Sequence, residues 1–255
     1  MARVNRQEIV IEHSAEEKRP LFPRIGYTQI LVILLVVSSY FLGVFSTQLK
    51  DLQNGQAVQG VAQAAAPAVS PTPAKVNVGL GFYPIEGNKN AKVTLVEFGD
   101  LRCPFCDQWY NNVQSQLMKD YVDTGKVRFA FRNYAFLGPS STVAANAVAC
   151  ANEQGKFWPM EAYLYKNQPP ETDTSMYTVA NLSQIAGTMG MDATQFQSCL
   201  SSNKYSSQVS QDLADGQKAG VTGTPTIFID GIPIVGAQPY SAFKTIIDQE
   251  LAKKT

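Results

Sequence analysis

The feature of this sequence that most restricts its fold is a pair of cysteines, Cys103 and Cys106, between a predicted strand and a predicted helix. The preceding run KVTLVEFGD (92–100) is apolar, rich in β-branched residues and ends in a turn, which predicts a buried strand. Apolar residues then recur close to a helical period over Cys103–Tyr121. Pro104 fits the first turn of that helix, where its missing N–H costs nothing. Both thiols are therefore predicted to lie where a helix begins.

The C-x-x-C spacing at the start of a helix has a chemical consequence. The two thiols lie within reach of a disulfide bond, and the first faces the helix N-terminus, where free N–H groups and the helix dipole favour a thiolate. A stabilised thiolate makes the disulfide easier to reduce and therefore a stronger oxidant of other thiols. An inert disulfide is the weaker interpretation, because bridging so short a loop adds little stability.

Composition excludes several other kinds of site. The chain has 255 residues and one histidine, His13, so the rest of it cannot build a Ser-His-Asp or Cys-His nucleophile. A zinc site at Cys103 and Cys106 would need two more ligands, and Cys150 and Cys199 are not spaced as a second knuckle. We therefore predict no metal and no cofactor. Lys+Arg and Asp+Glu are both 21, which gives no indication of nucleic-acid binding.

An uncharged stretch near the N-terminus predicts a membrane anchor. No residue from Ile25 to Leu49 is charged, and about twenty residues at roughly 1.5 Å each span a bilayer core, so we predict a transmembrane helix at 25–47. Three basic residues, the last of them Arg24, precede it, so the positive-inside rule leaves a cytoplasmic lead, 1–24, and sends the rest outside. A cleaved signal peptide would deliver the same domain to the same compartment. A buried core helix is a third interpretation, but its flanking segments could not cover it.

The remaining sequence divides into a linker and one outer domain. Residues 48–75 contain a stretch without charge or aromatic residues, LQNGQAVQGVAQAAAPAVSPTPA, which predicts a flexible linker. In the domain, 76–255, KVRFAFRNY predicts a second strand and a helical block follows over about 138–216. TPTIFIDGIPIVG then predicts a hairpin with an Asp-Gly turn, and YSAFKTIIDQELAKK a closing helix. This order predicts an α/β fold with a helical insertion between two halves of one sheet.

Two further features support redox chemistry. Thr224-Pro225 lies where a loop enters the hairpin, a place where a cis peptide bond can be held, although an ordinary proline at a strand entry is the alternative. Glu97 precedes Cys103 by six residues on the buried strand. A desolvated carboxyl group beside the sulfur pair can accept a proton, and its pKa should be raised. Pairing of Glu97 with a base such as Arg132 is the alternative.

Three motifs together, VTLVEFGDLRCPFC, ANEQGKFW and GVTGTPTIFIDG, resemble the DsbA-like thiol:disulfide oxidoreductases of the thioredoxin superfamily, over roughly Gly81 to Leu251. The resemblance implies a thioredoxin fold interrupted by a helical domain. It implies Cys103 as the attacked, solvent-facing sulfur and Cys106 as the resolving one, with Glu97 as the buried acid.

The resemblance also implies a substrate-binding surface. Pro225 should be cis and packed against the disulfide, and Thr224 should offer backbone hydrogen bonds to a substrate strand, with Pro104 and Phe105 beside them. Phe105 stands where well-known oxidising members have histidine. It cannot donate a hydrogen bond to the Cys103 thiolate, so oxidising power should be milder or depend more on the helix N-terminus.

The other two cysteines lie in the helical block. In an oxidising compartment Cys150 and Cys199 are expected to pair, as sometimes occurs in the resembled family, and a bridge over about fifty residues could add roughly 4 kcal/mol. Buried free thiols and a second redox pair are the alternatives.

These observations predict a monomeric, membrane-anchored oxidoreductase that introduces disulfide bonds into exported proteins outside the cytoplasm. The family implies reoxidation by a quinone-linked membrane enzyme, DsbB-like or VKOR-like. A disulfide isomerase or reductase of the same compartment is the nearest alternative, and a redox-silent polypeptide-binding module is the other.

Overall fold

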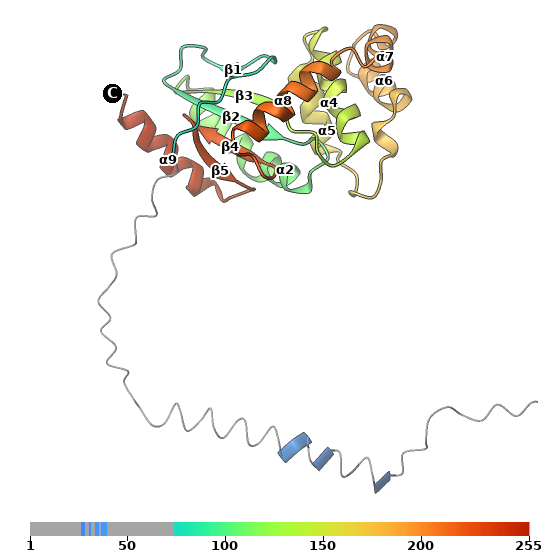
Figure 1. Ribbon diagram of the computed structural model, residues 1–255, viewed down its shortest axis with the longest axis vertical. Coiled ribbons are helices and arrows are strands. Elements are labelled where there is room, and N and C mark those ends of the chain that lie inside the picture. Colours follow the sequence, from blue (N-terminus) through green and yellow to red (C-terminus); the bar gives the residue numbers. More distant parts are fainter. Residues whose placement is uncertain (1–26, 29–30, 32–33, 36, 40–73, 255) are drawn as a thin grey trace, which may run out of the picture. The chain divides into compact units, whose positions relative to one another are not determined.

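The computed structural model describes residues 27–28, 31, 34–35, 37–39 and 74–254 (Figure 1). The predicted lead (1–24), most of the predicted anchor (25–47) and nearly all of the predicted linker (48–75) lie outside the described residues. The described residues between 27 and 39 are helical and exposed. Among all the residues described, the structure has no helix with the length and apolar character needed to cross a bilayer.

Within residues 74–254, five strands form one mixed sheet in the order β1-β3-β2-β4-β5 (Figure 1). The central strands β2 and β3 are parallel, and every other neighbouring pair is antiparallel. Both central strands are buried on both faces, β2 as its largely apolar run predicts, whereas β3 also buries Arg132 and Asn133. The two-residue strand β1 is too short to leave a signal in the sequence. The bounds are β1 Glu86–Gly87, β2 Val93–Gly99, β3 Val127–Asn133, β4 Thr226–Ile229 and β5 Ile232–Val235.

One face of the sheet is covered by the helix after the cysteine pair and by α9 (Tyr240–Ala252). Trp109 packs on Phe243 of α9 with ring centroids 4.5 Å apart. The sequence predicts one helix here, whereas the structure has α-helical turns alternating with two π-helical stretches: α2 Pro104–Trp109, η1 Tyr110–Gln114, α3 Ser115–Leu117 and η2 Met118–Val122. The apolar spacing could not show this, because the wider turns still bury nearly the same residues.

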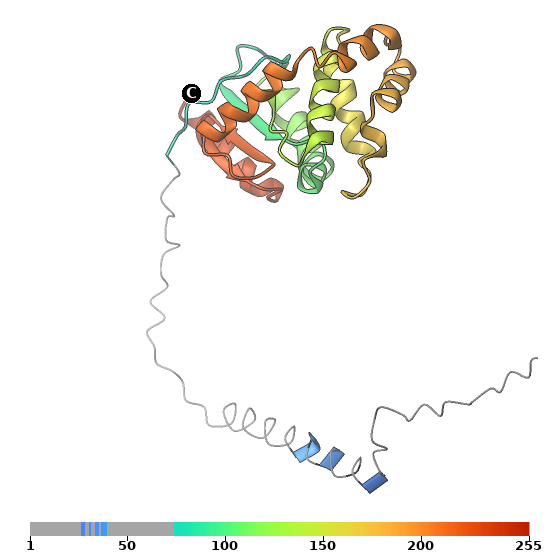
Figure 2. The ribbon, with the colours of Figure 1, turned by 45° about the vertical axis from the view of Figure 1, so that its right-hand side comes forward.

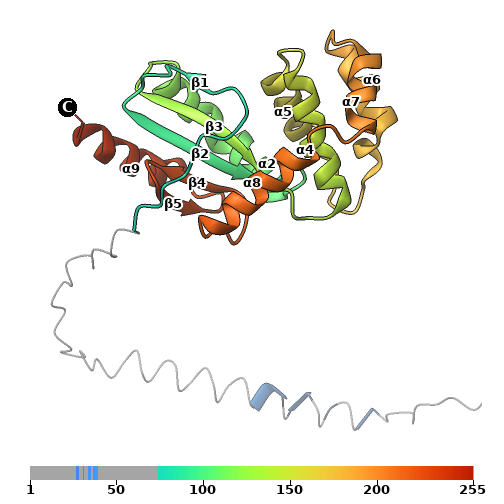
Figure 3. The ribbon, with the colours of Figure 1, turned by 45° about the horizontal axis from the view of Figure 1, so that its top comes forward.

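The opposite face is covered by α8 (Ser206–Lys218), which runs from the helical block across the sheet (Figures 1 and 3). Arg132 on β3 donates hydrogen bonds to Asp212 and Asp215 of α8, both at 2.6 Å. Gly216 lets this helix approach closely, since a Cβ there would lie 2.6 Å from the Tyr134 ring. The predicted insertion, about 138–216, thus includes a helix that belongs to the layer covering the sheet.

The rest of the helical block is a separate bundle beside the sheet, seen from different sides in Figures 2 and 3. A disulfide bond between Cys150 and Cys199 joins α4 to α7, with an S–S length of 2.08 Å and a Cα–Cα distance of 5.9 Å. The elements are α4 Pro139–Asn152, α5 Phe157–Lys166, η3 Ser175–Tyr177, α6 Val179–Thr188 and α7 Ala193–Ser201.

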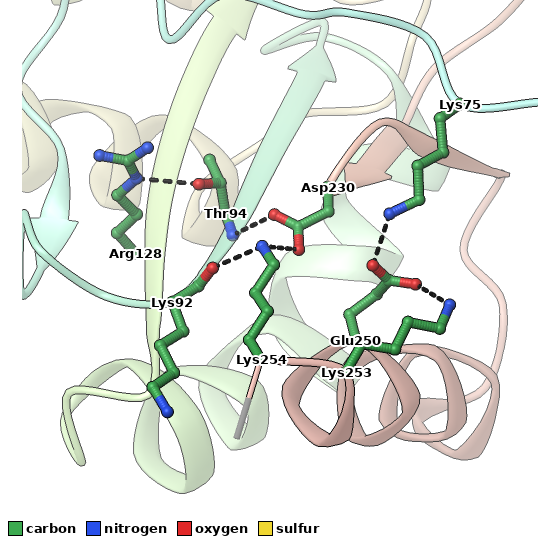
Figure 4. A network of polar contacts seen from close by, with 8 residues as sticks. All are labelled: Lys75, Lys92, Thr94, Arg128, Asp230, Glu250, Lys253 and Lys254. Atoms are coloured by element: carbon green, nitrogen blue, oxygen red, sulfur yellow. Dashed lines mark hydrogen bonds and ion pairs between the residues drawn. The ribbon is translucent and has the colours of Figure 1, made fainter.

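A polar network ties the start of the domain to its last helix (Figure 4). Glu250 of α9 is buried and pairs with Lys75 and with Lys253, each at 2.5 Å. Lys254 pairs with Asp230 in the hairpin turn at 2.5 Å. These contacts lie near the N-terminal end of β2, whereas the cysteine pair follows its C-terminal end.

Candidate functional site

The backbone at the end of β2 places the Cys103 sulfur at the beginning of α2. Cys103 has an extended conformation (φ −77°, ψ 122°) and is the N-cap residue. Its carbonyl oxygen accepts hydrogen bonds from the N–H groups of Cys106 at 3.0 Å and Asp107 at 3.1 Å, which closes the first turn. Pro104 occupies the first helical position, where no N–H is required. The sequence therefore fixes the cysteine at the positive end of the helix dipole.

A second segment, 121 residues further along the chain, faces the same sulfur. The Thr224-Pro225 peptide bond is cis and leads directly into β4. In its thiol form, Cys103 donates a hydrogen bond to the Thr224 carbonyl oxygen at 3.4 Å. The loop is fixed from within, because the Thr226 hydroxyl donates to the Gly223 carbonyl at 2.7 Å. The structure thus brings together the cysteine motif and the proline that the sequence singled out separately.

The surroundings of the two thiols differ. Cys103 and Cys106 are both free, and Cys106 is completely buried, whereas Cys103 is 4% exposed. The expected solvent-facing Cys103 is therefore nearly covered in this structure, because the Thr224-Pro225 loop lies against it. Pro104 and Phe105 between them are exposed, the Phe105 side chain by 58%. A partner can therefore approach over an apolar surface and meet Cys103 first.

Hydrogen bonding and burial give the two thiols different pKa values. The pKa of Cys103 is lowered to about 6, mainly by the hydrogen bond from the Cys106 thiol. Burial opposes this decrease, while hydrogen bonds from the Thr224 side chain and from the N–H groups of Cys106 and Phe105 add to it. The pKa of Cys106 is raised well above its ordinary value by burial, by its hydrogen bond to Cys103 and by the nearby charges. At neutral pH Cys103 is a thiolate and Cys106 a thiol.

Glu97 is buried close to the pair and has no basic partner among the residues that the structure describes. Its side chain is fully buried, and Oε2 accepts a hydrogen bond from the Trp109 indole N–H at 2.8 Å. Burial raises the pKa of Glu97 to about 8, and the charge on Cys103 adds to this while the Trp109 hydrogen bond opposes it. Arg132 cannot reach Glu97, because it follows Phe131, the register partner of Glu97, and points to the opposite face. The carboxyl group is neutral at pH 7 and can donate a proton.

Three residues that the sequence did not single out complete the site. Trp109 orients Glu97, as described above. Gln168, just after α5, donates to the carbonyl oxygens of Leu101 at 3.1 Å and Cys103 at 3.4 Å. Asp100 accepts N–H groups of the following loop and of the segment after β3. Trp109 could have been found from its helical spacing to the cysteines, whereas Gln168 comes from another part of the fold and leaves no motif.

Cys150 and Cys199 are bonded to each other in the bundle, so the four cysteines do not form one metal site. A strand, a C-x-x-C pair at a helix N-terminus and a cis-proline loop whose Thr224 carbonyl faces the first sulfur define the class: a thiol:disulfide oxidoreductase of thioredoxin fold.

Comparisons with known proteins agree with this class. The thioredoxin family profile matches residues 83–249. The "Probable disulfide bond formation protein D" of Bacillus cereus is 33% identical over 170 residues, which cover 66% of this chain and 78% of that protein. The corresponding Bacillus subtilis protein is 32% identical over 174 residues, covering 67% and 78%. The crystal structure of oxidised BdbD from Bacillus subtilis superposes with a TM-score of 0.63 at 30% identity, covering 67% of this chain and 93% of the other. The chain therefore belongs to the DsbA-like branch of the thioredoxin superfamily, and it is a protein thiol:disulfide oxidoreductase.

Proposed function

We propose that this oxidoreductase introduces disulfide bonds into exported proteins outside the cytoplasm, held at the membrane by a helix at 25–47 and the linker 48–75. The observation that carries the proposal is the difference in pKa between the two thiols. In the reduced form Cys103 is a stabilised thiolate, and the buried Cys106 is protonated. A stabilised reduced form makes the disulfide form a good oxidant. The Cys150–Cys199 bond fits an oxidising compartment.

The first half of the reaction uses Glu97 as an acid. A substrate thiolate attacks Cys103 Sγ of the Cys103–Cys106 disulfide, forming a substrate–Cys103 bond and leaving the electron pair of the broken S–S bond on Cys106. Since Cys106 has a raised pKa and is buried, its thiolate takes the proton of neutral Glu97, which lies close enough for its charge to act on Cys106.

The second half releases the product. Another substrate thiolate attacks the substrate sulfur, a disulfide forms in the substrate, and the electron pair of the mixed disulfide leaves on Cys103. Cys103 needs no proton at neutral pH, because its pKa is lowered to about 6. Reoxidation of the pair by a quinone-linked membrane enzyme, DsbB-like or VKOR-like, would close the cycle.

Substrates would bind along the edge formed by the cis-proline loop. The Thr224 carbonyl faces Cys103, and the exposed side chains of Pro104 and Phe105 offer apolar contact. Thr224 and Pro225 would position an extended substrate segment with its sulfur over Cys103. The role of the Cys150–Cys199 bond in this proposal is to hold α4 and α7 together.

The proposal is tested with a reduced, unfolded exported protein that needs disulfide bonds for activity. The oxidised chain should restore that activity stoichiometrically, and Cys103→Ser should abolish the reaction while leaving the fold intact. A redox-silent polypeptide-binding module would behave alike with and without Cys103. An isomerase would instead act from the dithiol form on a substrate with scrambled disulfides, and a reductase would have a reduction potential near that of thioredoxin.

A further inference from the structure

Buried polar atoms without partners gather on one side of the cysteine pair. Within residues 74–254, eight buried side-chain oxygen or nitrogen atoms lack a hydrogen-bond partner. Four of them lie along one route that leads from the site toward the helical block, on Glu97, Tyr165, Glu161 and Gln114. Buried polar atoms in folded proteins are normally paired, if not with protein then with ordered water, so this concentration points to a function.

The first step of the route joins Glu97 to Tyr165. A Cβ placed on Gly99 would lie 2.8 Å from Glu97 Oε1 and 2.8 Å from the Tyr165 hydroxyl. The two oxygens therefore lie at most twice that distance apart, a separation that a single bridging water can span. Each belongs to a fully buried side chain and has no partner among the described residues.

The next step runs along α5, which packs against α2 and η1. Glu161 precedes Tyr165 by four residues, so the two side chains are neighbours on one face of the helix. Glu161 and Gln114 both line a cavity of about 600 Å³. Their unpartnered oxygens, Glu161 Oε1 and Gln114 Oε1, are the last buried atoms of the route. The route thus begins at the acid close to the cysteines and ends at a cavity.

We propose that Tyr165 and Glu161 carry protons between Glu97 and water in this cavity. The proposal rests on the exchange at Cys103 and Cys106 and adds the path by which Glu97 regains and loses its proton. When the pair is reoxidised, Cys106 Sγ attacks Cys103 Sγ of a mixed disulfide, the Cys103–Cys106 bond forms, and the electron pair leaves on the partner's sulfur. The Cys106 proton passes to Glu97, which must first have given its own proton to the cavity.

The charged groups around the route favour the neutral forms of Glu161 and Tyr165, which can donate and accept protons. Burial raises the pKa of Glu161, and the charges of Glu97 and Glu86 add to this, while hydrogen bonding from Gln114 and the charge of Lys166 oppose it.

Tyr165 faces a similar set of groups. Burial raises its pKa, and the charges of Cys106, Glu97, Glu161 and Asp100 add to the increase. The pKa of Tyr110, which stacks on Tyr165 at 5.2 Å, is raised to about 12 by burial and by Glu161 and Glu86.

The test follows the resolving step in the full chain. A mixed disulfide of Cys103 with thionitrobenzoate is prepared, and release of the coloured thiolate by Cys106 is recorded between pH 5 and 10. Tyr165→Phe and Glu161→Gln, which keep shape and remove the transferable proton, should slow release about tenfold at pH 6–7. Above pH 9 the rates should equal that of the parent chain, since Glu97 has then already lost its proton.

Tyr163→Phe, a hydroxyl deletion on the same helix but outside the route, is the matched control and should release the thiolate at the parent rate throughout. A structural effect of the substitutions would slow release equally at every pH, and that result, or rates equal to the parent at pH 6–7, overturns the proposal. Thermal unfolding of each variant checks that it has folded. If the parent chain itself never releases the thiolate, the exchange at the cysteine pair fails instead, so the two failures are distinguishable.

Discussion

Two glutamates of this domain are equally buried and behave in opposite ways. Glu97 is fully buried and Glu250 is 1% exposed. Glu250 accepts from Lys75 and Lys253 (Figure 4), and although burial opposes its charge, these two hydrogen bonds hold its pKa below the ordinary value. Glu97 has only the Trp109 indole, and burial raises its pKa to about 8. The partner, more than the burial, decides whether a buried carboxyl is charged.

The difference matches the positions of the two residues. Glu250 joins the first described segment of the domain to the last helix, where a fixed charge pair holds two ends of the chain together. Glu97 lies beside two sulfurs whose protons must move, where a permanent counter-ion would fix its charge. A basic residue is available one position from its register partner, at Arg132, but the alternation of the strand turns it to the other face, toward Asp212.

The largest effect is expected from Glu97→Gln. Because folding raises the pKa of Glu97 from 4.5 to about 8, this residue does not destabilise the fold below pH 4.5, and its destabilising effect grows as the pH rises toward 8. The amide removes that effect, so the reduced variant should match the parent near pH 4 and exceed it by about 3 kcal/mol at pH 7. Urea unfolding at the two pH values measures this. The same variant should oxidise substrate about 100-fold more slowly. Equal stability at pH 7 would contradict a neutral, unpaired Glu97.

Glu250→Gln should act in the opposite direction and more weakly. The depressed pKa of Glu250 means that its ion pairs stabilise the fold above the unfolded pKa of about 4.5, and that this contribution is lost as the pH falls through the folded value. Because Lys75 and Lys253 are half exposed, with side chains 50% and 59% exposed, screening limits the loss to about 1 kcal/mol at pH 7. The same urea series measures it. Activity should be unchanged, since the network lies away from the cysteines.

Much of this site could be predicted from local sequence. The strand, the cysteine pair with Pro104 and the hairpin entry at Pro225 each leave a signal within a dozen residues, because each depends on backbone geometry that few residue types allow. The acid at Glu97 follows from its place on a buried strand. The same alternation argues against Arg132 as its partner, since adjacent strand positions face opposite sides.

The contribution of the helical block could not be predicted. Gln168, Tyr165 and Glu161 reach the site from α5 and the turn after it, more than fifty residues beyond the cysteines. The apolar spacing shows that α5 is buried, but not which neighbour each of its faces meets. The π-helical stretches leave no signal for a related reason, since they alter the backbone without altering the pattern of buried residues, and the two-residue strand β1 is too short to leave one.

The smallest effect is expected from Trp109→Phe, and it isolates the one polar partner of Glu97. The indole N–H stabilises the charged carboxylate, so its loss should raise the pKa of Glu97 further above 8, by about one unit for a hydrogen bond to a charged group. Infrared titration of the carboxylic C=O band, assigned by its absence in Glu97→Gln, measures the shift. Trp158→Phe is the control, since its indole N–H has no partner in the described part of the chain. If both variants titrate like the parent, then hydrogen bonding does not tune Glu97, and burial alone separates it from Glu250.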